Sequence, residues 1–146
     1  MGKAQLEELE KHGRYFSVPK GVSMRPMTER NRKTILEVRR LDGPARRGDV
    51  VMYIRPDLQG VIHRVLWVRD GYYIIAGDNC WQREYVRKEQ VRGIVVSFCR
   101  KGRWIGVDNK WYRCYSRVWT DLYFIRRPVL YLRDKGRRLL RRIHGR

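Results

Sequence analysis

Residues 61–76 read VIHRVLWVRDGYYIIA, two apolar runs on either side of Asp70-Gly71. Val, Ile, Tyr and Trp dominate both runs, and an Asp-Gly pair between such runs is a strong signal for a two-residue β-hairpin. Similar short runs recur along the chain, at residues 34–38, 49–54 and 93–98. Because no helical pattern separates these runs, we predict a mostly β domain over residues 14–108, folded as an antiparallel barrel or coiled sheet.

A helix is predicted on each side of this domain. Residues 5–12 place Leu6 and Leu9 at i, i+3 among charged side chains, and Gly13 follows as a stop signal, which predicts a short amphipathic helix within residues 1–13. After Lys110 the apolar period changes to that of one helical face, formed by Tyr115, Val118, Trp119 and Leu122. Pro128 then breaks this helix or opens a second one, which carries Leu132, Leu139, Leu140 and Ile143. We therefore expect a helical extension over residues 109–146.

The chain is strongly basic. It has 146 residues, of which 34 are Lys or Arg and 15 are Asp or Glu, giving a formal net charge of +19. Residues 111–146 alone contain eleven Lys and Arg against two Asp. This excess indicates a polyanionic partner or an anionic membrane surface. Two interpretations of the extension stay open: residues 115–122 packing on the β domain, and residues 137–143 binding anionic lipid as a peripheral anchor.

Other sequence features bear on the compartment. No apolar run is long enough to span a bilayer, and the charged first residues lack the apolar core of a secretory signal. Cys80, Cys99 and Cys114 are far apart and form no CxxC pair, which favours reduced thiols over a zinc site. We expect a cytoplasmic protein, peripheral at the inner face of the membrane through its basic extension, with no metal and no cofactor.

Three short segments carry residues with catalytic chemistry. The first is Gly21-Val22-Ser23-Met24-Arg25-Pro26, in which Ser23 occupies a constrained turn. A turn serine usually hydrogen-bonds only its own backbone, but on a rigid turn it can also serve as a nucleophile. In the second segment, strand alternation puts His63 on one face with Val61 and Val65. On its own, that pattern favours a buried histidine with a structural role, and it leaves open a neutral imidazole that acts as a general base.

The third segment is Gly77-Asp78-Asn79, directly after the second run of the predicted hairpin. Asp and Asn at a strand end commonly close a turn, yet a carboxylate here can also orient the imidazole of His63. His63 lies seven residues before Asp70-Gly71 and Asp78 seven residues after it. An uninterrupted hairpin register therefore predicts that Asp78 and His63 lie opposite each other on adjacent strands.

In this order the segments resemble the signal-peptidase and LexA-type serine peptidase superfamily, over residues 14–100. Five stretches carry the resemblance: Ser23-Met24-Arg25-Pro26, Gly48-Asp49-Val50-Val51, His63-Arg64-Val65, Gly77-Asp78-Asn79 and Val91-Arg92-Gly93-Ile94-Val95. They are similar to the family's S-M-x-P, G-D-[IV]-V, H-R-[VI], G-D-N and [IV]-x-G-x-[VI] motifs. The third belongs to the branch with histidine where bacterial signal peptidases and LexA-type repressors have lysine.

The resemblance implies a coiled, all-β catalytic domain in which Ser23 is the nucleophile and His63 the general base. Asp78 is the expected supporting acid, and Glu84 is a second candidate. The backbone N–H of Ser23 would serve the oxyanion hole, with Gly21, Met24 and Pro26 as neighbouring substrate and oxyanion positions. Typical signal peptidases have a serine where this chain has Gly21. No membrane anchor or helix-turn-helix precedes the motifs, so the expected protein is a stand-alone, soluble member.

Three functions follow from these observations. The first is a serine endopeptidase that cleaves a peptide or preprotein through Ser23 and His63. The second is a basic nucleic-acid-binding module, in which some of the fourteen Trp and Tyr side chains stack on bases. The third is an inactive peptidase-like scaffold with an incomplete oxyanion hole. We favour the endopeptidase.

Overall fold

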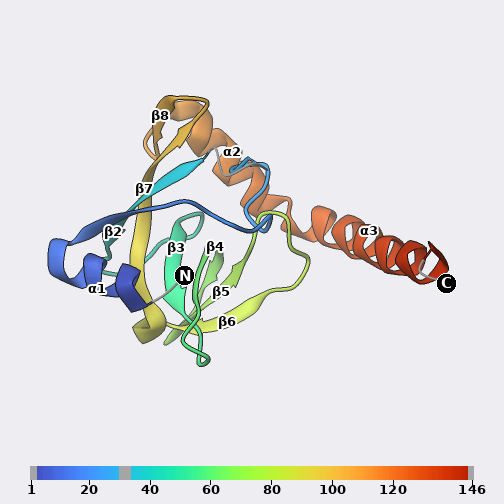
Figure 1. Cartoon of the computed structure of the whole chain (residues 1–146), viewed down its shortest axis with the longest axis horizontal. Helices are drawn as coiled ribbons and strands as arrows, with labels where there is room; N and C mark the ends of the chain where they lie inside the picture. The colour runs from blue at the N-terminus through green and yellow to red at the C-terminus, as the bar shows by residue number, and fades with distance from the viewer. Residues whose placement is uncertain (1–2, 30–33, 145–146) are drawn as a thin grey trace.

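The computed structural model describes residues 3–29 and 34–144, and it is built on one antiparallel β-sheet (Figure 1). The elements in chain order are α1 (Lys3–His12), β1 (Arg14–Ser17), β2 (Ile35–Arg40), β3 (Val50–Ile54), β4 (Gly60–Val68), β5 (Tyr72–Ala76), β6 (Glu84–Arg87), a short 3₁₀ turn (Lys88–Gln90), β7 (Val91–Arg100), β8 (Arg103–Gly106), α2 (Lys110–Asp121) and α3 (Tyr123–His144). The strand order is β1-β2-β7-β3-β4-β5-β6, with β8 paired to β7. The predicted mostly β fold with helices at both ends is thus confirmed.

The three strands that the apolar runs do not predict lie at the margins of the sheet. β1 and β6 are the two ends of the strand order, and β8 is a short branch on β7. Their sequences, RYFS, EYVR and RWIG, mix charged and apolar residues within four positions. A marginal strand has only one hydrogen-bonded neighbour and one covered face, so it needs no continuous apolar run.

Apolar side chains are buried on both faces of the central strands. Met52 of β3 packs in a first cluster with Leu36, Val38 and Phe98. Its neighbours in the strand point the other way, into a second cluster that includes Val51, Tyr53, Val65, Tyr73 and Ile75. The β3 and β4 strands therefore present different side chains to the two faces, and this alternation decides which residues can meet at a site.

The helical extension differs from its sequence-based prediction in two ways. Val118 and Leu122 are 46% and 45% exposed, whereas Tyr112 and Thr120 are buried, so the face that packs on the sheet is rotated from the predicted one. The break between the helices falls at Leu122 rather than at Pro128. Pro128 lies in the second turn of α3, where it costs that helix only one backbone hydrogen bond.

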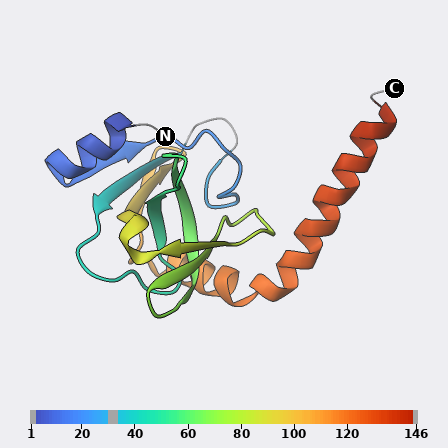
Figure 2. The same ribbon diagram turned by 90° about the horizontal axis from the view of Figure 1, so that it is seen from below.

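The two helices also differ in their relation to the sheet. α2 runs along the β domain, while the C-terminal part of α3 projects away from it (Figures 1 and 2). In the described ranges no helix has the length and apolar character needed to cross a bilayer.

Candidate active site

The segment around Ser23 consists of successive turns rather than regular structure. The N–H of Arg25 donates to the carbonyl of Val22 and that of Thr28 to the carbonyl of Met24. The Ser23 side chain is half-buried, and Met24 points into the first cluster with 3% exposure. Gly21 and Pro26 are exposed.

The Gly77-Asp78-Asn79 segment, which follows β5, is hydrogen-bonded to the Ser23 segment through Asn79. The backbone N–H of Asn79 donates to the carbonyl of Ser23 at 2.7 Å, and its side-chain amide donates to the carbonyl of Val22 at 3.1 Å. A Cβ added to Gly77 would come within 2.7 Å of the backbone carbonyl oxygen of Ser23 and within 3.0 Å of the Ser23 Cβ. Only glycine permits this approach, so this loop fixes the backbone of the serine.

His63 lies in β4 on the face that the sequence predicts. Its side chain is 8% exposed, and its ring lies against that of Tyr53, a member of the second cluster. His63 Nδ1 is 3.3 Å from the Tyr53 hydroxyl and 3.4 Å from Glu84 Oε1. Because a carboxylate can only accept hydrogen bonds, we assign the ring proton to Nδ1, which leaves the lone pair on Nε2.

Glu84 is held in place by an arginine. Arg55 donates from Nε and Nη2 to the two carboxylate oxygens of Glu84, at 2.8 and 2.6 Å. Burial raises the pKa of Glu84, but hydrogen bonds from His63, Arg55 and Tyr53 outweigh burial, and the net pKa lies well below its ordinary value. Burial and the Glu84 charge raise the pKa of Tyr53, which keeps its hydroxyl neutral. The imidazole thus faces a permanently ionised carboxylate.

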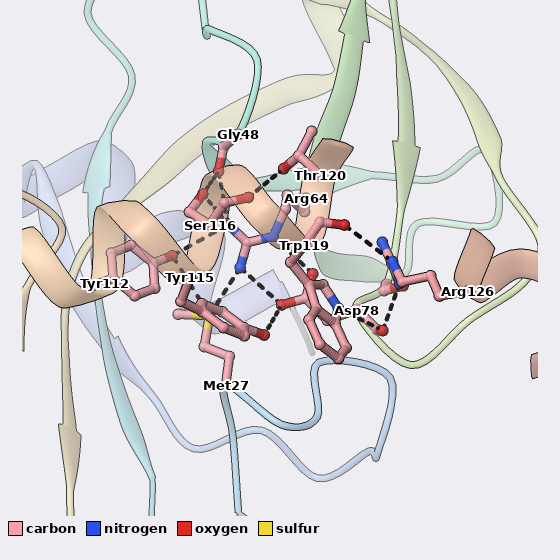
Figure 3. A network of polar contacts seen from close by, with 11 residues as sticks. Met27, Gly48, Arg64, Asp78, Tyr112, Tyr115, Ser116, Trp119, Thr120 and Arg126 are labelled. Atoms are coloured by element: carbon pink, nitrogen blue, oxygen red, sulfur yellow. Dashed lines mark hydrogen bonds and ion pairs between the residues drawn. The ribbon is translucent and has the colours of Figure 1, made fainter. Parts of the chain in front are cut away.

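Asp78 does not lie at His63, so its prediction as the supporting acid is wrong. Its carboxylate binds Arg64, which donates from Nε at 2.7 Å and from Nη2 at 2.8 Å (Figure 3). A register shift in the hairpin explains the difference. Val68 pairs with Tyr73 as the turn predicts, but a bulge between Val65 and Trp67 moves the remaining pairs by one residue. Arg64 then pairs with Ala76, and the same register places His63 level with Gly77.

The Arg64–Asp78 pair is the centre of a buried polar network. Both side chains are fully buried. Arg64 Nη1 also donates to the carbonyl of Gly48 and to the hydroxyl of Ser116, and the Tyr115 hydroxyl donates to Asp78 at 2.7 Å (Figure 3). Two of these partners belong to α2, so the network fixes that helix on the sheet. Every oxygen of the carboxylate has a donor, which is the condition for a buried charge to be tolerated.

The start of α3 extends this network to the loop that holds Ser23. Arg126 donates to the carbonyl of Asp78 at 2.6 Å, and Trp119 Nε1 donates to the same oxygen at 2.9 Å. Arg133 Nη1 donates to Asn79 Oδ1 at 2.6 Å. The helical extension is therefore part of the framework that positions the serine, a role that its charge pattern alone did not indicate.

A groove with a volume of about 530 Å³ opens beside Ser23. Its wall includes Gly21 and Met24 but not Pro26. The rest of the wall comes from Ser17 to Lys20, Gly60 to Ile62, Ala4 and Gln5 of α1, and Leu36 of β2. Gly60 to His63 pair with β3 on one side, whereas the pairing of β4 with β5 starts only at Arg64. One backbone edge of this segment is thus unpaired in the sheet and faces the groove region.

Sequence reasoning missed Tyr53 and Arg55. Strand alternation could have identified them. Val51 pairs with His63, and Tyr53 lies two residues further along β3 on the same face. Among the described residues, no hydrogen bond joins the Ser23 hydroxyl to His63. In comparisons with family models, with curated proteins and with solved structures, no match to this chain was found.

Proposed function

We propose that this protein is a serine peptidase of the LexA and signal-peptidase type, in which Ser23 attacks, His63 is the general base and Glu84 orients the base. One observation carries the proposal: His63 Nδ1 lies between Tyr53 and ionised Glu84. This arrangement leaves the basic Nε2 for a second partner, as a Ser-His-acid mechanism requires.

The loop around Gly77 supports Ser23 as that partner. Ser23 packs against Gly77, and Gly77 stands level with His63 in the sheet. Adjacent strands are about 4.8 Å apart, and in our proposal the serine comes within side-chain reach of the imidazole. Catalytic hydrogen bonds are often long or unformed before substrate binds, which fits a hydroxyl not yet bonded to the base.

In this mechanism His63 Nε2 takes the proton of the Ser23 hydroxyl as its oxygen attacks the scissile carbonyl. The Glu84 carboxylate stabilises the imidazolium that forms, and Arg55 keeps that carboxylate in place. The N–H of Ser23 faces the developing oxyanion. His63 then returns the proton to the leaving amine, and water hydrolyses the acyl-enzyme by the same steps in reverse order.

The groove supports a peptide as the substrate class. An extended peptide can add to an unpaired strand edge through main-chain hydrogen bonds, and Gly60 to His63 offer such an edge next to Ser23. Binding there brings a peptide carbonyl toward the nucleophile. Because the contacts are made by the peptide main chain, they do not require particular side chains in the peptide far from the cleavage site.

The test is cleavage of a complex peptide library by the purified chain, read by mass spectrometry. Ser23→Ala and His63→Ala are expected to lower the rate of product formation by at least about 10³-fold while the circular dichroism spectrum stays unchanged. The matched controls Ser97→Ala and His12→Ala are expected to cleave as the wild type does. Cleavage at the wild-type rate by the Ser23 variant contradicts the proposal. A wild-type chain that cuts no peptide favours the inactive scaffold instead.

A further inference from the structure

One face of α3 carries an exposed apolar stripe along most of its length. Ile125, Val129, Leu132, Leu139 and Ile143 follow one another at spacings of four, three, seven and four residues, which places them on one helical face. Each of the five is between 59% and 65% exposed. We call these five residues the α3 stripe. Contiguous apolar surface of this kind marks a surface that binds a partner.

The stripe faces away from the part of the molecule that α3 packs against. α3 contacts the loop before β6 through other residues: the Tyr123 hydroxyl donates to the carbonyl of Trp81, the Tyr131 ring lies 5.0 Å from that of Trp81, and Arg133 binds Asn79. None of these belongs to the stripe. Beyond them the helix extends free of the β domain (Figure 2).

The flanks and the back of the same helix are cationic. Five exposed basic side chains lie within its last ten residues: Lys135, Arg137, Arg138, Arg141 and Arg142. The one acid in α3, Asp134, is already bound to Arg133 at 2.9 Å. An occupant of this surface must therefore combine an apolar phase with negative charge.

A second copy of the chain does not meet this requirement. The stripe has the spacing of a coiled-coil seam, but Arg126, Arg133, Lys135 and Arg142 occupy the positions that flank the seam. Two such helices would place like charges against each other, which opposes pairing. A nucleic acid would neutralise the arginines but leave the stripe in water.

We propose that α3 is a membrane-surface helix that lies in the interface of a bilayer containing anionic phospholipid. Its stripe enters the acyl boundary, and its arginines and Lys135 contact the lipid headgroups. Arg133 of this helix binds Asn79, which in turn binds the Ser23 carbonyl, so membrane binding holds the candidate active site close to the lipid surface.

Vesicle co-sedimentation of the full-length chain tests this proposal. Wild-type protein is expected to pellet with vesicles of phosphatidylcholine that contain about one third phosphatidylglycerol, in salt of about 150 mM, and to stay in solution with pure phosphatidylcholine. The double variant Leu132→Ser/Leu139→Ser is expected to bind at least roughly tenfold more weakly. The double variant Arg137→Gln/Arg141→Gln is expected to lose binding in the same range, through charge rather than apolar contact.

Leu58→Ser is the matched control, because Leu58 is 79% exposed and lies far from α3 in the chain. It is expected to pellet as the wild type does, and circular dichroism of every variant checks that the helix remains. The proposal is overturned if the stripe variant binds vesicles as tightly as the wild type. It is equally overturned if the wild type ignores anionic vesicles but forms a dimer that the stripe variant dissociates, or binds duplex RNA with no effect of the stripe variant. Peptide cleavage in free solution is read separately and does not enter this outcome.

Discussion

Glu84 and Asp78 are both bound by an arginine, yet Glu84 lies next to the His63 imidazole and Asp78 belongs to the network that binds α2. The carboxylate of Glu84 accepts hydrogen bonds from Arg55 and also lies next to Nδ1 of His63. Both carboxylate oxygens of Asp78 accept hydrogen bonds, from Arg64 and from the Tyr115 hydroxyl. At the scale of single residues, the partners of each carboxylate therefore decide its role, and proximity in sequence to His63 does not.

This difference predicts that a substitution of Glu84 lowers catalysis directly, through the imidazole of His63. Glu84→Gln removes the charge that stabilises the imidazolium and the acceptor that fixes its tautomer. We expect kcat to fall by on the order of 10²–10⁴-fold with little change in fold. Steady-state cleavage of a library-derived peptide measures the effect.

Glu89→Gln is the control, since Glu89 is an exposed carboxylate near the same strand. Its activity should equal that of the wild type. Full activity of the Glu84→Gln variant would remove Glu84 from the mechanism.

Glu84 also predicts a pH dependence of stability. Its pKa is lowered in the folded chain, so the ionised form stabilises the fold. This contribution is complete above the unfolded pKa of about 4.3 and declines as the pH falls toward the folded-state pKa. Urea unfolding at a series of pH values should show a steeper loss of stability below about pH 5 in the wild type than in Glu84→Gln. Parallel curves for the two chains would contradict the assignment.

At the scale of elements, the pair of Arg64 and Asp78 fastens α2 to the sheet. Asp78→Asn leaves a fully buried guanidinium without its counter-charge, and we expect a loss of about 3–5 kcal/mol in the free energy of unfolding. Chemical denaturation measures it. Asp121→Asn is the control, because Asp121 binds Arg47 and Arg117 at the surface and its loss should cost less than about 1 kcal/mol. Equal effects of the two substitutions would contradict the network's role.

The elements also show what sequence patterns can and cannot predict here. Residues 61–76 predict their hairpin because both strands are mostly apolar and the Asp70-Gly71 pair joins them. The bulge between Val65 and Trp67 has no characteristic sequence signal. The register beyond it, and therefore the partner of His63, could not be predicted from the sequence. Glu84 was found as an alternative only through the resemblance, and Arg64 was missed because a buried arginine needs a partner that only the fold supplies.

At the scale of the whole molecule, α3 divides into two parts with separate tasks. The first part, up to Arg133, bonds to the loop that holds Ser23, and residues 135–143 have exposed side chains on all sides of the helix. The free energy of unfolding of a chain that ends at Arg137 should therefore lie within about 0.5 kcal/mol of that of the full-length chain, and the proposed peptidase activity should be unchanged. A chain that ends at Asp121 should lose both stability and activity. Denaturation and peptide cleavage compare the three chains, and equal behaviour of the two truncations would contradict this division.

Consecutive residues of β4 point to opposite faces of the sheet: His63, the proposed general base, to one face, and Arg64, which binds α2, to the other. A deletion of one residue between Gly60 and Ile62, compensated elsewhere, would exchange their directions and disable chemistry and assembly in a single step. Any variant of this chain that gains or loses a residue in this strand is therefore expected to lose both roles at once.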